Sequence, residues 1–303
     1  MKSPGKMQPE TENPLSVRGH LAQSLRHHAR RHRRALRRCR RKFSEQAVHD
    51  MRVETRRLLA HLDLLEAILT GAAAISRARR TLKKYLKHSA ALRDAQVQVR
   101  QVEEMLPAHP ALKPFHRHLR RRRRQRLRAA PGKIKGSARL WNDLKTIEKN
   151  TRTKPADPEA DRLDRTAAGR ALQEAWTQTM ESRQGRSAGT PDSRHRTRIM
   201  LKKTRYMAEA LAPLPDVFDA GRLKQAHAAQ DLIGDIHDLE LILARLGKFM
   251  AREKNRGPRL EPVRRTLRRR HAQLVRRWAS TKLCVGNDNL CGAGRPEPVV
   301  AFP

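Results

Sequence analysis

The sequence predicts an all-α protein, and three observations support this prediction. Apolar residues recur at three- and four-residue steps through most of the chain, which is the period of a helix with one buried face. Prolines and glycines fall between these periodic segments, where helices end. No alternating run of apolar and polar residues is long enough to indicate a β-strand. We therefore expect helices joined by short connections, as in a helical bundle.

The first helix is expected to begin at residue 17, after a polar, proline-containing segment (residues 1–16) that we interpret as a disordered arm. Between residues 17 and 42 there are eleven Arg or Lys and no Asp or Glu. Like charges four residues apart repel each other, so this helix should be stable only when it is docked or bound to an anion. Its expected buried stripe is Leu21, Leu25, His28, His32, Leu36, Cys39 and Phe43.

Three more helices complete the first half of the chain, which we place at residues 17–131. Ser44 resembles the N-cap of the second helix. Pro107 ends the third, and Pro131 ends the fourth. The expected ranges are roughly 44–71, 74–105 and 112–129.

The order of helices then repeats after a mixed segment. Residues 132–158 are interpreted as a linker that holds one short helix near 138–149. The second half is placed at residues 159–282, and residues 283–303 are interpreted as a flexible tail. Its expected helices cover roughly 159–183, 192–211, 219–251 and 259–282.

A short basic pattern occurs twice, once in each half. Residues 49–57 read HDMRVETRR and residues 195–203 read HRTRIMLKK, 146 positions apart. In each copy a His is followed by cations three, seven and eight residues later, and this spacing aligns the first three side chains along one helix. Asp94 and Asp238 follow the two copies and are 144 positions apart. The pattern indicates a duplicated helical unit whose halves each present a cationic ridge.

The overall charge indicates a polyanionic partner. The chain has 68 Lys and Arg against 30 Asp and Glu, a formal net charge of +38. Such a charge repels itself in a compact state unless a partner neutralises it, and nucleic acid, an anionic membrane and inorganic polyphosphate are the candidates. No apolar stretch is long enough to span a bilayer, and no secretory signal is recognisable, so we expect a cytoplasmic protein. Neither a disulfide framework nor a metal site is expected from the three cysteines, Cys39, Cys284 and Cys291.

The duplicated pattern resembles the CHAD family, the conserved-histidine α-helical domain. That family carries a basic helix of the form VHxxRVxxRR followed by a long helix bearing RD, and both are repeated. VHDMRVETRR at 48–57 and ALRDAQV at 91–97 fit the first copy, and RHRTRIMLKKTRY at 194–206 and LIGDIHDLEL at 232–241 fit the second. The resemblance covers roughly residues 17–282.

The resemblance implies two tandem four-helix bundles related by a pseudo-two-fold axis, with a basic cleft between them. It further implies that the cleft binds inorganic polyphosphate and that the protein associates with polyphosphate granules. Since no ExExK strand is found, we expect a stand-alone copy of the domain. The ligand contacts that the motif carries over are His49, Arg52, Arg56, Arg57, His195, Arg198, Lys202, Lys203 and Arg205.

Other residues extend the candidate site. Asp94 and Asp238 are expected to hold motif cations in place rather than to bind metal. His49 and His195 could each be a hydrogen-bonded structural residue, a phosphate contact or a catalytic group. Five further cations are candidate contacts of the ligand: Lys84, Arg120, Arg124, Arg265 and Arg269.

We expect no enzymatic activity and no cofactor. Arginine forms bidentate bonds with phosphate oxygens, and polyphosphate has no bases, so a receptor for it needs cations rather than aromatic platforms. Aromatic residues make up only 3% of the chain. The main alternative is sequence-independent binding of RNA, DNA or the ribosome, which the charge permits but the scarce aromatics disfavour. A weaker alternative is a phosphohydrolase, although neither a P-loop nor a cluster of carboxylates for magnesium is visible.

Overall fold

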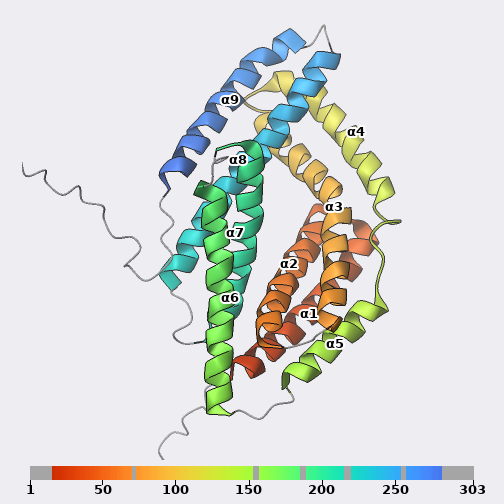
Figure 1. The fold of residues 1–303 in the computed structure, drawn as a ribbon. Coiled ribbons are helices and arrows are strands. Elements are labelled where there is room, and N and C mark those ends of the chain that lie inside the picture. The colour runs from red at the N-terminus through yellow and green to blue at the C-terminus, as the bar shows by residue number, and fades with distance from the viewer. Residues whose placement is uncertain are drawn as a thin grey trace, which may run out of the picture. The chain divides into compact units, whose positions relative to one another are not determined.

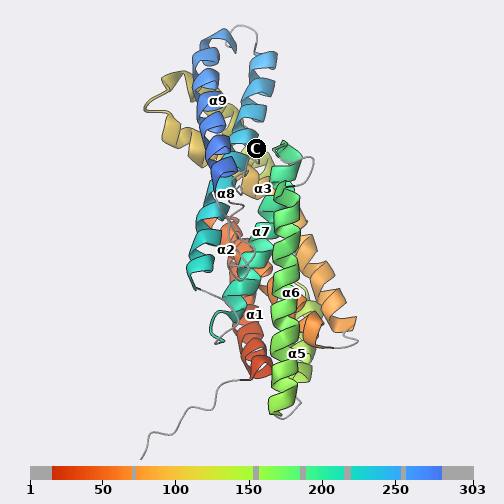
Figure 2. The same cartoon turned by 60° about the vertical axis from the view of Figure 1, so that its left-hand side comes forward.

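The computed structural model describes residues 16–69, 73–152, 157–184, 189–214, 220–253 and 257–281. Within these ranges the chain forms nine α-helices and one 3₁₀ helix, and no strand (Figures 1 and 2). The all-α prediction is therefore confirmed. The predicted tail at 283–303, with Cys284 and Cys291, lies outside the described residues, as does all of the predicted arm except Ser16.

The helices begin and end close to the predicted positions. Ser44 caps the second helix, where its hydroxyl accepts a hydrogen bond from Ala47 N at 3.2 Å. In order, the elements are α1 (Val17–Lys42), α2 (Glu45–Ile68), α3 (Ala73–Met105), η1 (Pro110–Leu112), α4 (Lys113–Ala129), α5 (Ala138–Arg152), α6 (Pro158–Gln184), α7 (Pro191–Leu211), α8 (Ala220–Arg252) and α9 (Gly257–Ser280).

The chain divides into two compact units whose segments alternate along the sequence. Unit 1 comprises Met1–Arg93, Leu127–Leu172 and Ala210–Val217, and unit 2 comprises Asp94–Arg126, Gln173–Glu209 and Phe218–Pro303. The long helices α3 and α6 each contribute to both units. Two sequential four-helix bundles, with the boundaries given above and a cleft between them, stay a prediction.

In unit 1, α1 docks on α2 and α5, and its buried face follows the predicted stripe. Leu21, Leu25 and Cys39 are fully buried, and His28 remains partly exposed. Helix α1 has no carboxylate of its own, so its ion pairs come from other helices. Its carboxylate partners are Asp164 for Arg18, Glu54 for Arg31, Asp50 for Arg38 and Glu148 for Arg26.

Helix α5 occupies most of the segment that we interpreted as a linker, and it is a docked part of unit 1. Leu140, Leu144 and Ile147 are buried. The carboxylate of Asp143, itself only 6% exposed, accepts two hydrogen bonds from Arg77 of α3, at 2.7 and 3.0 Å. These contacts fix α5 against the rest of unit 1.

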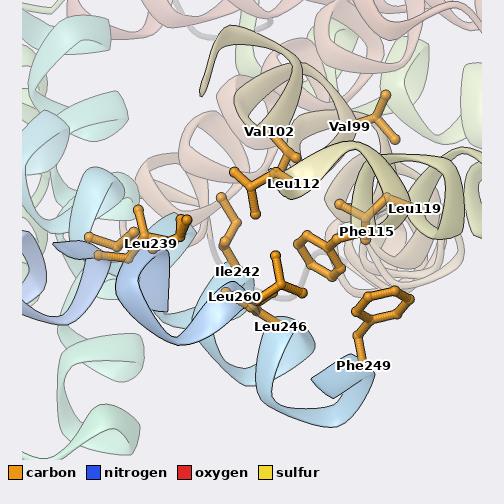
Figure 3. Packing of buried hydrophobic residues seen from close by; sticks show 12 residues of the cluster. Val99, Val102, Leu112, Phe115, Leu119, Leu239, Ile242, Leu246, Phe249 and Leu260 are labelled. Atoms are coloured by element: carbon orange, nitrogen blue, oxygen red, sulfur yellow. The ribbon is translucent and has the colours of Figure 1, made fainter. Parts of the chain in front are cut away.

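Unit 2 is built on two apolar clusters. The first joins the C-terminal part of α3, η1, α4, α8 and α9, where Phe115 and Phe249 pack with ring centroids 5.4 Å apart (Figure 3). The second joins α6, α7, α8 and α9 around Trp176, Leu201 and Trp278. Buried residues of α7 and α8 pack in the second cluster. This packing fixes the direction in which the polar face of each helix points.

Candidate functional site

A cationic groove lies between α1 and α2 in unit 1, and we call it the α1–α2 groove. Its volume is about 530 Å³. The motif residues His49 and Arg57 line it together with arginines of α1, and the carboxylates of Asp50 and Glu54 are also part of its wall. Six arginines against two carboxylates leave the groove with a formal charge of +4. The arginines are Arg31, Arg34, Arg37, Arg38, Arg41 and Arg57.

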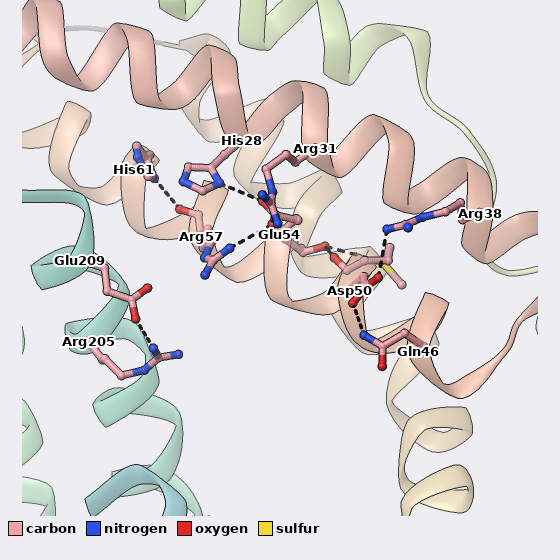
Figure 4. A network of polar contacts seen from close by, with 12 residues as sticks. His28, Arg31, Arg38, Gln46, Asp50, Glu54, Arg57, His61, Arg205 and Glu209 are labelled. Atoms are coloured by element: carbon pink, nitrogen blue, oxygen red, sulfur yellow. Dashed lines mark hydrogen bonds and ion pairs between the residues drawn. The ribbon is translucent and has the colours of Figure 1, made fainter. Parts of the chain in front are cut away.

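Glu54 organises one end of the α1–α2 groove (Figure 4). Its carboxylate accepts hydrogen bonds from His28 at 2.8 Å, Arg31 at 2.8 Å and Arg57 at 3.0 Å. Burial by itself raises the pKa of Glu54, but the hydrogen bonds and charges of these neighbours outweigh it and lower the pKa to about 2. Glu54 is thus ionised at neutral pH, and it orients the guanidinium groups of Arg31 and Arg57.

Three other arginines of the groove form no hydrogen bond with a carboxylate of the described residues. Arg34, Arg37 and Arg41 are exposed on α1 and form no hydrogen bond or ion pair with other residues of the described ranges. By contrast, Arg38 donates to Asp50 at 3.0 Å. The groove therefore combines oriented cations at one end with side chains that are available to an incoming anion.

The remaining first-half candidates are distributed differently. Arg52 is directed toward α3, where its Nη1 donates to Leu86 O and Ser89 Oγ, both at 2.7 Å. Arg56 is partly buried on α2, and Lys84 is exposed on α3. Two residues of the first motif, His49 and Arg57, therefore line the α1–α2 groove. A third, Arg52, instead links α2 to α3 through its hydrogen bonds.

In unit 2, the second motif forms a cluster with α8. The rings of His195 and His237 lie with centroids 5.0 Å apart. Burial lowers the pKa of His237 to about 4, and the charges of Arg198, His195 and Lys202 act in the same direction. Because His195 is exposed, a purely core-packing role for it is disfavoured. His49 is exposed as well.

Asp94 and Asp238 both act on Arg198, as carboxylates that hold a motif cation would. Burial lowers the pKa of the Arg198 guanidinium, and the negative charges of Asp238 and Asp94 oppose that effect. Burial raises the pKa of Asp238, and Arg198 and Lys202 oppose it in turn. Gln101 also donates a hydrogen bond to Asp238 at 3.3 Å. Asp94 belongs to unit 2 with the second motif, although it follows the first motif in sequence.

Arg205 differs from the other motif cations because it is buried. Its side chain is 8% exposed, donates to Gln230 at 2.7 Å and pairs with Glu209 (Figure 4). Lys203, two residues earlier, is exposed. A guanidinium held in this way stabilises the packing of α7 on α8, and we therefore expect Arg205 to contact no ligand.

The four candidate arginines in the basic runs of α4 and α9 are exposed. Arg120 and Arg124 lie on α4, and Arg265 and Arg269 lie on α9, all in unit 2. Their contact with a ligand stays a prediction.

Sequence reasoning missed the polar residues that support these clusters. Glu54 lies inside the first motif and could have been noticed as an acid among cations. Arg194, which stands before the motif histidine where the first copy has Val48, is 7% exposed and donates to Glu240 of α8 at 3.0 Å. His271 of α9 reaches the same carboxylate at 3.2 Å. An ion pair across helices thus replaces the apolar contact that an aliphatic side chain would make.

The described residues define an all-α protein that gathers arginine and histidine on the faces of α1, α2 and α7. None of its helices, so far as they are described, is apolar over a length that would cross a membrane. The family model of the CHAD domain matches residues 20–247. The chain therefore belongs to the CHAD family, which is associated in general terms with polyphosphate binding.

Two solved structures are similar to this chain. The chain is similar to the crystal structure of the CHAD domain from the plant Ricinus communis, with 18% identity, a TM-score of 0.55, and coverage of 93% of this chain and 94% of that one. It is also similar to PptA from Streptomyces chartreusis, with 21% identity, a TM-score of 0.49, and coverage of 87% and 99%. At such identities the first likeness supports the fold alone. No curated protein matches the sequence.

Proposed function

We propose that this protein binds inorganic polyphosphate without catalysing its reaction, and that it acts at polyphosphate granules in the cytoplasm. The observation that carries the proposal is the α1–α2 groove, where six arginines and the motif residue His49 surround a volume of about 530 Å³. A linear chain of phosphates offers many equivalent oxygens to such a set of guanidinium groups, each of which can donate two hydrogen bonds.

The cluster of unit 2 supports the same proposal. His195, Arg198, Lys202 and Lys203 carry the second motif on α7, and the carboxylates of Asp94 and Asp238 act on Arg198. Nε of Arg198 is buried and has no hydrogen-bond partner in the described part of the chain. A donor in that state favours an anionic acceptor close by. Each unit would then contribute its own set of phosphate contacts.

The test uses the three groove arginines that have no ion pair within the described ranges. Replacing Arg34, Arg37 and Arg41 together by Ala should weaken the binding of long-chain polyphosphate by roughly one to two orders of magnitude, because about three phosphate contacts are lost. Since these side chains are exposed, the fold should be retained. Isothermal titration calorimetry measures the affinity, and circular dichroism checks the helix content.

A matched control distinguishes the loss of groove arginines from the loss of the same positive charge elsewhere on the protein. Arg80, Arg139 and Arg170 are exposed in the same unit and do not line the groove. Replacing them by Ala removes the same charge, and the affinity should stay within about twofold of the wild type. Equal losses in both triple variants would mean that the groove has no special part in binding.

Two further measurements address the alternatives. In a competition experiment, long-chain polyphosphate should remain bound when RNA is added at equal phosphate equivalents; ready displacement would favour a nucleic-acid-binding protein. The protein should also release no orthophosphate from polyphosphate in the presence of magnesium. Release that disappears when His195 and Arg198 are replaced would identify a hydrolase instead.

A further inference from the structure

A second groove borders α1, on the side that packs against α5. We call it the α1–α5 groove, and its volume is also about 530 Å³. It has no lining residue in common with the α1–α2 groove and contains no residue of either motif. Polyphosphate binding at the motifs therefore does not explain which residues line the α1–α5 groove.

The α1–α5 groove has an apolar and aromatic floor. Leu25 and Leu144 are buried beneath it, and Trp141 of α5 is partly exposed within it. The guanidinium carbon of Arg33 lies 5.9 Å from the centre of the Trp141 ring, near the outer limit of a cation–π contact. Trp141 is also the single aromatic side chain among the lining residues of this groove.

The rim of the groove is cationic. Five cations line it against the single carboxylate of Glu148, which leaves a formal charge of +4. Among the described residues, Glu148 forms two long ion pairs, at 3.8 Å to Arg26 and 4.0 Å to Arg152. Arg30 and Lys145 are exposed and form no hydrogen bond or ion pair with other described residues. The five cations are Arg26, Arg30, Arg33, Lys145 and Arg152.

The walls of the groove are fixed in place. The ion pair between Asp143 and Arg77 anchors α5. On the α1 side, the buried His32 shares a hydrogen bond of 3.0 Å with Thr55, and the ring of Trp141 packs against it with centroids 5.5 Å apart. The indole and the cations are therefore positioned before any ligand arrives, which reduces the entropy lost on binding.

We propose that the α1–α5 groove binds a single nucleotide, with a nucleoside triphosphate as the ligand of matching charge. The base would stack on Trp141 in the place that the Arg33 guanidinium now takes, and the phosphates would bind Arg26, Arg30 and Lys145. A phosphate chain without a base leaves the indole unused. A single-stranded nucleic acid would use several aromatic platforms in succession, and this groove has one. The volume lies within the usual range for small-molecule sites, about 300–1,000 Å³.

The experiment compares ATP with inorganic tripolyphosphate, which has the same phosphate chain and no base. Replacing Trp141 by Ala should weaken ATP binding about five- to tenfold and leave tripolyphosphate binding unchanged, because only the base stacks. Trp141→Phe should retain most of the ATP affinity. If Trp141→Ala leaves ATP binding unchanged, or weakens both ligands equally, the proposal is wrong.

A second pair of variants tests the proposal even if the Trp141→Ala protein does not fold. Replacing the exposed Arg30 and Lys145 by Ala should weaken ATP binding, and replacing the exposed Arg80 and Arg139 should not. The variant with Arg34, Arg37 and Arg41 replaced by Ala should bind polyphosphate more weakly, by roughly one to two orders of magnitude, and should keep its affinity for ATP. If that variant loses ATP while Arg30→Ala/Lys145→Ala keeps it, the nucleotide binds in the α1–α2 groove and the proposal is overturned. Failure of polyphosphate binding alone would leave it standing.

Discussion

At the scale of single residues, Glu54 holds two arginines that line the α1–α2 groove. It is 3% exposed and accepts hydrogen bonds from His28, Arg31 and Arg57. A buried acid inside a binding site for anions weakens the local positive potential. In return it fixes two guanidinium groups that would otherwise repel each other.

Replacing Glu54 by Gln should lower the free energy of unfolding at pH 7 by about 1–3 kcal/mol, because three donors lose a buried, charged acceptor. The pKa of Glu54 is about 2 in the folded protein, below its ordinary value of 4.5. Its stabilising contribution is therefore present above pH 4.5 and is lost as the pH falls toward 2. Urea denaturation at several pH values should show the two proteins converging at the acid end.

Asp50→Asn provides the comparison for Glu54→Gln. Asp50 pairs with the exposed Arg38, so its replacement should change stability by less than about 1 kcal/mol. Equal effects of the two substitutions at pH 7 would contradict the central position assigned to Glu54.

His237 should couple ligand binding to proton uptake. Burial and the charges of Arg198, His195 and Lys202 hold its pKa at about 4, below the ordinary 6.5, and the nearby Asp238 also faces this group of cations. A bound phosphate chain would neutralise those cations and favour the protonated imidazole. Near pH 5 the wild type should therefore take up a fraction of a proton more than His237→Gln, as measured by calorimetry in buffers of different ionisation enthalpy. The same uptake in both proteins would place the ligand away from this cluster.

At the scale of elements, α8 contains two glycines whose side-chain positions are open. A Cβ atom at Gly234 would meet nothing within 4 Å, and the same is true of Gly247. Gly234→Ala should therefore raise the free energy of unfolding by about 0.5–1 kcal/mol, since alanine loses less backbone entropy in a helix. Thermal denaturation gives the change, with Gly247→Ala as the matched control. Destabilisation by Gly234→Ala alone would mean that the packing at this position differs from the structure.

The helices themselves could be predicted from the sequence because each has its own periodic apolar face and its own ends. The groove could not, because the packing of α1 on α2 is a tertiary contact. Nothing in the spacing of Arg34, Arg37 and Arg41 shows that they lie beside His49. Similarly, the apolar positions of α5 predict a short helix but do not reveal the ion pair of Asp143 that docks it.

The length of α3 allows it to contribute residues to both units. The helix has 33 residues and is therefore about 50 Å long, more than a small bundle needs. Its first part belongs to unit 1 with Arg52, and its remainder, from Asp94 onward, belongs to unit 2 with Arg198. The order of landmarks in the sequence is repeated, but a long helix can carry a residue from one unit into the other.

At the scale of the whole molecule, the charge of +38 is the dominant property. Such a charge attracts any polyanion, so affinity alone does not distinguish a specific groove from the general electrostatic field. The salt dependence does distinguish them, because the slope of log K against log salt concentration counts the ions that are released at the contacts actually made.

The most direct measurement is the affinity for long-chain polyphosphate over a range of salt concentrations, in three proteins. These are the wild type, the groove variant with Arg34, Arg37 and Arg41 replaced by Ala, and the control with Arg80, Arg139 and Arg170 replaced by Ala. We predict that the slope becomes shallower by about 2–3 in the groove variant, nearly one unit for each lost phosphate contact, and that the control keeps the wild-type slope. Equal slopes in the two triple variants would contradict binding in the α1–α2 groove.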